Sequence, residues 1–149
     1  METLNIGDIA PDFETVDQDG KTVKLSDFKD SIVILYFYPK DNTPGCTMEA
    51  KNFRDNMGIF AEKGIKVFGV SVDSPESHKK FQNKLNLNFT LLSDKEKDIV
   101  HKYGVMGMMT AKRVTYIIKD GKIVYVYPHV SPKEHAKEVY DKLVELKLI

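Results

Sequence analysis

Tryptophan is absent from this chain of 149 residues, and cysteine occurs only once, at position 46. One cysteine cannot form an intramolecular disulfide, so the fold must be held by its apolar core, which a chain of this length can supply. The lack of disulfides agrees with a reducing compartment. It also leaves a single thiol whose presence requires an explanation.

An excess of charge of either sign is also missing, because 22 basic residues balance 22 acidic ones. Without a block of lysine and arginine, we expect no nucleic-acid partner and no membrane-surface partner. The N-terminus lacks the basic and apolar regions of a signal peptide, and no apolar run reaches membrane-spanning length. We therefore expect a cytoplasmic protein with one domain, residues 1–149, that acts on a small molecule or a protein partner.

Motifs for metals and organic cofactors are lacking as well. The four histidines, His78, His101, His129 and His135, show no paired spacing of metal ligands, and we interpret them as structural or exposed. The segment 17–20 lacks the remainder of a calcium loop and is better interpreted as a hairpin turn. No glycine-rich phosphate loop or dinucleotide motif is present. We expect neither a metal nor a cofactor.

Hydrophobic patterning and turn residues predict alternating strands and helices. In chain order, the expected elements are a hairpin within residues 1–30, a strand at 32–38, a helix at 44–64, a strand at 65–72, a helix at 74–85, a strand at 89–92, a helix at 95–103, a hairpin of 114–118 with 123–126, and a last helix from 131. A βαβ unit followed by a ββα unit is the order of a thioredoxin-like α/β sandwich. We predict a central mixed sheet flanked by helices, with an N-terminal β-hairpin extension.

The last of these helices is predicted from its opening and its apolar spacing. Ser131 and Pro132 have the residue types of a helix start. Val139, Leu143 and Leu146 then fall on one helical face.

Cys46 lies where the strand at 32–38 gives way to the helix predicted from Pro44. In the first turn of a helix the backbone N–H groups have no intrahelical partners and the helix dipole is positive, so a thiolate is favoured over a thiol. An isolated cytosolic cysteine is more commonly a small buried hydrophobe. Its polar, turn-rich neighbours at 42–47 instead favour a reactive thiol at the carboxyl edge of the sheet, where open α/β folds place their sites.

The residues around this cysteine also match a family signature. Pro39, Thr43 and Cys46 fit the pattern Pro-x-x-x-Thr-x-x-Cys of the peroxiredoxins. With Tyr-Phe-Tyr before it and Pro-Gly inside it, the segment closely resembles the bacterioferritin-comigratory (PrxQ-like) subfamily. The resemblance extends from the segment 7–13 to the hairpin at 113–121. It implies a monomeric, cofactor-free, thiol-dependent peroxidase that reduces hydrogen peroxide and small organic hydroperoxides.

The resemblance also implies residue roles. Cys46 would be the peroxidatic cysteine, Thr43 would hydrogen-bond the peroxide, and Pro39 would shield the site from water. Arg113 would be the family's active-site arginine. During attack by the thiolate, negative charge shifts to the leaving oxygen, where Arg113 and Thr43 would stabilise it. The free N–H groups of Gly45 and Cys46 would act in the same way.

Arg113 and its possible partner Glu49 can also be interpreted more simply from the sequence alone. Arg113 could be a solvated cation at the start of a strand. Glu49, three residues after Cys46, could orient Arg113 through a carboxylate–guanidinium pair. It could equally serve only the helix dipole as an acidic residue in the first turn.

The chain departs from the family pattern in two places. Many PrxQ-like proteins have a resolving cysteine five residues after the peroxidatic one, where this chain has Lys51. The sulfenic acid of Cys46 would therefore be reduced by an external thiol, either a small thiol or a thioredoxin- or glutaredoxin-type protein. The second departure is the segment 104–111, where the family often has a longer loop. Its three methionines could line a substrate mouth or partner surface, or could fill gaps in the core.

Two other functions compete with a peroxidase. A thioredoxin-like disulfide reductase would need a Cys-x-x-Cys pair, which this chain lacks. A non-catalytic binding or chaperone module could keep the same fold and use the methionine segment as a contact surface, since a fold does not determine function.

Overall fold

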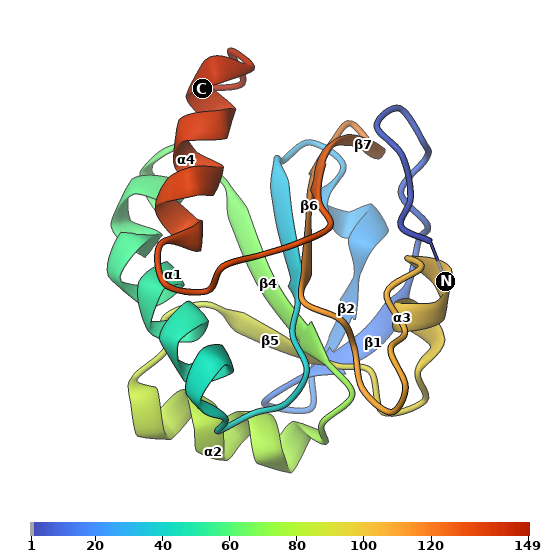
Figure 1. Ribbon diagram of the computed structural model, residues 1–149, viewed down its shortest axis with the longest axis vertical. Helices are drawn as coiled ribbons and strands as arrows, with labels where there is room; N and C mark the ends of the chain where they lie inside the picture. The colour runs from blue at the N-terminus through green and yellow to red at the C-terminus, as the bar shows by residue number, and fades with distance from the viewer. Residues whose placement is uncertain (1) are drawn as a thin grey trace.

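The computed structural model describes residues 2–149, in which seven strands form one mixed sheet. The strands are β1 (Glu14–Asp17), β2 (Thr22–Lys24), β3 (Val33–Phe37), β4 (Lys66–Ser71), β5 (Thr90–Ser93), β6 (Val114–Lys119) and β7 (Lys122–Tyr127). The helices are the 3₁₀ helix η1 (Leu25–Phe28) and the α-helices α1 (Pro44–Glu62), α2 (Pro75–Leu85), α3 (Asp98–Lys102) and α4 (His135–Glu145). In Figure 1, α1, α2 and α4 lie on one side of the sheet and α3 on the other. This confirms the predicted thioredoxin-like sandwich.

The strand β3 lies inside the sheet, and its two neighbours decide which segments meet where β3 ends. It runs parallel to β4 and antiparallel to β6, in the order β2-β1-β5-β4-β3-β6-β7. All five residues of β3 are buried, which suits a run of apolar side chains covered on both faces. Because β6 is antiparallel, its first residue, Val114, pairs with Phe37, the last residue of β3. The start of β6 and the chain leading into α1 therefore arrive at the same edge.

Two hydrophobic clusters pack against the two faces of the sheet. On the face covered by α1, α2 and α4, Phe53 of α1 stacks on Tyr36 of β3 with ring centroids 4.5 Å apart. On the other face, Tyr103 follows α3 and packs edge-on against Tyr116 of β6 at 5.4 Å. The alternating side chains of the central strands thus hold both helical layers.

Both hairpins predicted from turn residues are confirmed. β1 pairs with β2, and β6 pairs with β7 through the Asp-Gly turn at 120–121, where both residues have positive φ. The first hairpin is also part of the main sheet, because β1 pairs antiparallel with β5. No helix within residues 2–149 is both long and apolar enough to span a membrane.

Two helix starts predicted from the sequence were wrong. α3 begins at Asp98 rather than at residue 95, because Lys97 has a φ of +63°. The carboxylate of Asp94 accepts hydrogen bonds from the N–H groups of Ile99 and Val100 and so organises the helix start from outside it.

α4 begins at His135 rather than at Ser131, and Pro132 lies in the preceding turn. The N–H of Ala136 donates to Asn52 Oδ1 of α1 at 2.7 Å, so another helix provides the cap. Leu146 follows the end of α4 and is 38% exposed, so it does not belong to the buried face that was predicted for it.

The stacked Phe53 gives a test of the core. Phe53→Ala should lower the free energy of unfolding by about 3–5 kcal/mol, because the ring is fully buried and the surrounding aromatic side chains cannot close the cavity. Urea denaturation measures the loss. Ile59→Ala, on the exposed side of the same helix, should change it by less than about 0.5 kcal/mol. Equal losses in the two variants would contradict this account of the core.

Candidate active site

Cys46 lies in the first turn of α1, as predicted, with only 2% of its surface exposed. Thr43 is the N-cap residue, and the first backbone bond of the helix runs from Thr47 N–H to the Thr43 carbonyl. The N–H groups of Gly45 and Cys46 precede that bond and have no carbonyl partner within the helix. Cys46 therefore belongs to the turn that carries these two backbone donors and the positive end of the helix dipole.

Arg113 reaches this sulfur from the residue just before β6. One guanidinium nitrogen, Nη2, donates to Cys46 Sγ at 3.3 Å, and the other, Nη1, donates to Glu49 Oε1 at 2.7 Å. The arginine side chain is 19% exposed and that of Glu49 is fully buried. Arg113 is therefore not a solvated strand-end cation, and Glu49 pairs with it instead of serving only the helix dipole.

The charges of this group depend on one another. Burial raises the pKa of Glu49 to about 7, although Arg113 acts to lower it. Burial acts to lower the pKa of Arg113, but the charges of Glu49 and Cys46 together raise it above its ordinary value. The guanidinium therefore stays charged, and Glu49 titrates near neutral pH.

A glycine makes room for the guanidinium over the helix start. A Cβ atom at Gly45 would lie 3.0 Å from Arg113 Nη2 and 3.9 Å from the ring of Pro132. The loop before α4 thus also borders the site. His135, the first residue of α4, is buried. Its Nε2 forms a hydrogen bond of 2.8 Å with Thr115 Oγ1. Burial, together with Arg113, lowers the pKa of His135 to about 4, so the ring is neutral.

Thr43 and Pro39 lie in the loop between β3 and α1 and are both partly buried. The Thr43 hydroxyl donates to the carbonyl oxygen of Lys40 at 2.8 Å and does not cap the helix. It is thus held on the same loop as Pro39, one turn before Cys46. With its proton directed to Lys40, the Thr43 oxygen can accept a hydrogen bond from a peroxide O–H.

The methionine segment has a mixed environment. Met106 is partly buried and packs against the core cluster on the α3 side. Met108 and Met109 are exposed, so they do not fill gaps in the core.

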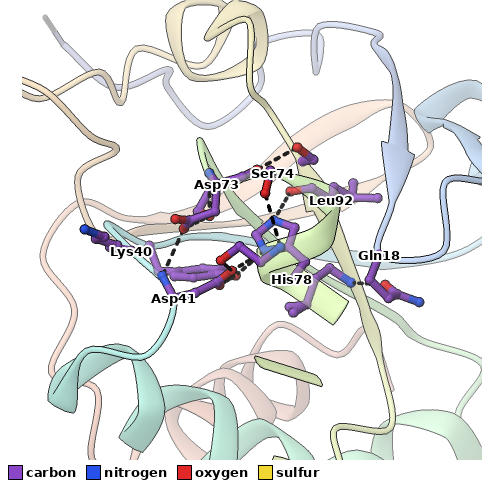
Figure 2. A network of polar contacts seen from close by, with 12 residues as sticks. Gln18, Lys40, Asp41, Asp73, Ser74, His78 and Leu92 are labelled. Carbon is purple, nitrogen blue, oxygen red and sulfur yellow. Dashed lines mark hydrogen bonds and ion pairs between the residues drawn. The ribbon is translucent and has the colours of Figure 1, made fainter. Parts of the chain in front are cut away.

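The structure also brings together polar residues that the sequence analysis did not connect. Asp41, Asp73 and His78 offer ligand atoms within 4.8 Å of one another, and Figure 2 shows them facing each other. Sequence spacing gave no signal for this group, because its members come from three separate segments. All three side chains are already hydrogen-bonded to protein groups. His78 and His135 are buried and structural, whereas His101 and His129 are exposed, as predicted.

Comparison with known proteins gives a consistent result. Residues 6–126 match the model of the AhpC/TSA family. The peroxiredoxin Bcp of Escherichia coli strain K12 is 42% identical over 154 aligned residues, which cover 97% of this chain and 99% of that protein. The peroxiredoxin Bcp of Bacillus subtilis strain 168 is also 42% identical, with 97% and 98% covered.

Several solved structures are also similar to the structure of this chain. A mutant of PrxQ from Xylella fastidiosa superimposes with a TM-score of 0.92 at 30% identity and covers 99% of both chains. The bacterioferritin comigratory protein of Xanthomonas campestris, studied for its alkyl peroxide reduction activity, has a TM-score of 0.88 at 27% identity, with 97% of this chain and 98% of that chain covered. These similarities do not favour a non-catalytic binding module.

The buried Glu49 predicts a pH-dependent stability. The folded protein holds this proton more tightly than the unfolded chain does, so the contribution of Glu49 to the free energy of unfolding is lost as pH rises from 4.5 to about 7. The difference in unfolding free energy between the wild type and Glu49→Gln should fall by about 2–3 kcal/mol over this range. Urea denaturation at several pH values measures it.

Glu62→Gln, at the exposed end of the same helix, serves as the control and should give no such trend. The His135 titration is common to all three proteins and cancels in the differences. A wild-type to Glu49→Gln difference that does not change with pH would refute the shifted pKa.

Proposed function

This chain belongs to the AhpC/TSA family and is a thiol-dependent peroxidase, a peroxiredoxin with a single cysteine, and from this premise we propose that Cys46 attacks the peroxide. The observation that carries the proposal is the position of Arg113, which donates both to Cys46 Sγ and to the buried carboxylate of Glu49. The nucleophilic form of cysteine is the thiolate, and Arg113 and the helix start place positive charge beside the sulfur that would carry this negative charge.

The reaction at this site is a displacement on oxygen. The Cys46 thiolate forms a bond to one peroxide oxygen while the O–O bond breaks, and Cys46 becomes a sulfenic acid. The other oxygen leaves with negative charge and takes up a proton to give water or an alcohol. The Arg113 guanidinium, whose fork stays in place because Glu49 holds its other nitrogen, stabilises this charge.

Three further groups act on the same step. The backbone N–H groups of Gly45 and Cys46 donate toward the reacting oxygens, because the helix leaves them without partners. The Thr43 hydroxyl binds the peroxide and orients it. Pro39 covers the site against water, which strengthens each electrostatic contact there.

Reduction of the sulfenic acid requires a second thiol from outside the chain. Position 51, five residues after Cys46, is an exposed lysine, and the chain has no other cysteine. An external thiol attacks the sulfenic sulfur and releases water, giving a mixed disulfide, and a further thiol then restores Cys46. The reductant is a small thiol or a thioredoxin- or glutaredoxin-type protein.

The substrates of this reaction are hydrogen peroxide and small organic hydroperoxides. The alkyl peroxide reduction for which the Xanthomonas campestris relative is known supports the organic class. We propose that the chain works as a monomer, with residues 1–149 as one domain, in the cytoplasm. The balanced charge of 22 basic and 22 acidic residues and the presence of only one cysteine, which excludes an intramolecular disulfide, are consistent with this setting.

Variants at Cys46 and Arg113 test the chemistry. With stoichiometric hydrogen peroxide and a sulfenic-acid trap, intact mass should show rapid labelling of the wild type and none of Cys46→Ser. Arg113→Ala should lower the second-order rate constant about 100-fold, because the main stabiliser of the leaving oxygen is lost. Lys119→Ala, at the far end of β6, serves as the control and should react like the wild type. A folded Arg113→Ala variant with wild-type reactivity would contradict the role given to this arginine.

Turnover tests the one-cysteine mechanism. The oxidised protein, given a small monothiol, should form a mixed disulfide at Cys46, and peroxide consumption should continue only while thiol is supplied. Intact mass and peroxide assays follow the two steps. Sustained turnover without added thiol, or a covalent dimer through Cys46 formed in place of the mixed disulfide, would exclude this cycle.

A further inference from the structure

A second buried pair of polar side chains, Asp41 and His78, lies beside the active-site helix. Asp41 belongs to the loop between β3 and α1, and His78 belongs to α2. His78 Nδ1 lies 2.7 Å from Asp41 Oδ2, and the two side chains are 0% and 3% exposed. Figure 2 shows the pair within a network that also contains Asp73 and the carbonyl group of Leu92.

The hydrogen bonds of this network determine where the protons are. His78 Nε2 lies 2.9 Å from the carbonyl oxygen of Leu92, which can only accept, so this nitrogen carries a proton. Both oxygens of Asp41 accept from hydroxyl groups, Oδ1 from Tyr38 at 2.6 Å and Oδ2 from Ser77 at 2.8 Å. The third contact of this carboxyl group is with His78 Nδ1, so Asp41 is held by three side chains at once.

The backbone of Asp41 is fixed as well as its side chain. Its N–H donates to Asp73 Oδ2 at 2.9 Å, and the same oxygen accepts from the Ser71 hydroxyl at 2.6 Å. Asp41 thus joins the loop directly to Asp73, in the segment after β4, and to His78 of α2. Through Asp73 it is also connected to Ser71 at the end of β4. The next residue, Asn42, has a φ of +62° and accepts from Lys84 of α2 at 2.6 Å.

This anchor lies inside the reactive motif. Asp41 is two residues after Pro39 and two before Thr43, the N-cap of α1. A shift of Asp41 would move the Thr43 hydroxyl and the first turn that presents Gly45 and Cys46. Errors of about 1 Å in the placement of reacting groups can cost two orders of magnitude in rate.

A metal ion is a poorer explanation of the cluster. The oxygens of Asp41 and the nitrogens of His78 are all occupied by the hydrogen bonds described above, and so is Asp73 Oδ2. Every one of these bonds has a protein donor or acceptor of the correct type.

We propose that the hydrogen-bonded pair of Asp41 and His78 is a positioning element of the peroxidase: it binds the loop of residues 39–43 to α2 and thereby sets Thr43 and the start of α1 for attack on the peroxide. Neither residue touches the reacting atoms. The proposal rests on the proposed function of Cys46 and concerns only how that site is held.

The test compares two reactions of Cys46 in folded variants. Asp41→Ala should lower the rate constant with hydrogen peroxide about 10- to 100-fold, because the loop loses its anchor. Alkylation of Cys46 by iodoacetamide does not use the peroxide-orienting groups and should change less than about threefold. Peroxide reactivity of folded Asp41→Ala within about threefold of the wild type would overturn the proposal.

A conservative variant distinguishes positioning from general stability. In Asp41→Asn, the amide oxygen can still accept from Tyr38 and the amide nitrogen can donate to a neutral His78, so the peroxide rate should recover to within about threefold of the wild type. Leu85→Ala removes a core side chain from α2, the helix that also carries His78. This variant should be less stable but should keep the peroxide rate of the wild type. A rate for Asp41→Asn as low as that of Asp41→Ala, or an equal loss in Leu85→Ala, would refute positioning by the pair.

Two measurements remain decisive if Asp41→Ala does not fold. Ser77→Ala removes one hydroxyl donor from Asp41 and leaves its contact with His78, so its peroxide rate should stay within about threefold of the wild type, and a loss of about 10-fold or more would overturn positioning by the Asp41–His78 pair. Nitrogen-15 NMR of the wild type should show a proton on His78 Nε2, which the Leu92 carbonyl requires, and a bare Nε2 would refute the ring orientation on which the pair depends. Failure of the proposed function itself is distinguishable, because the wild type would then react with peroxide no faster than free cysteine.

Discussion

The position of β3 between a parallel and an antiparallel neighbour is the constraint on which the site depends. The parallel neighbour β4 requires a crossover through α1, so the chain leaves β3 at one edge and enters the helix there. The antiparallel neighbour β6 starts at that same edge. Cys46 and Arg113, which are 67 residues apart in sequence, meet because of these two pairings. The complete burial of β3 fixes the register, since a shift by one residue would exchange the two faces of the core.

Two buried carboxyl groups also lie near this edge of the sheet. Glu49 and Asp41 are both carboxyl groups almost without solvent contact, and each has a basic side chain as its partner, Arg113 in one case and His78 in the other. Removing such groups from water is costly, and a packed apolar pair of the same size would often give a more stable protein. The start of α1 is therefore held between two buried polar pairs whose benefit is fixed geometry more than folding energy. One pair faces the sulfur, and the other faces the loop that leads to it.

Local signals in the sequence predicted much of the fold and part of the site. The Asp-Gly turn, the strand before Pro44 and the placement of Cys46 in a first turn all depend on neighbouring residues, and the structure has them. Features that depend on distant residues were missed or left open. The start of α4 was misplaced because its cap comes from Asn52 of another helix. The pairing of Asp41 with His78, 37 residues away, has no local signature at all.

Gly45 has a consequence that reaches beyond its own turn. The atom that a side chain at position 45 would crowd is Arg113 Nη2, the nitrogen that donates to Cys46 Sγ. A methyl group there would require this nitrogen to shift by a few tenths of an ångström, which strains its bond to the sulfur. A substitution at position 45 would therefore change the position of the positive charge beside Cys46 more than it would change the packing of the core. The absence of a side chain at Gly45 is therefore what leaves room for the guanidinium next to the sulfur.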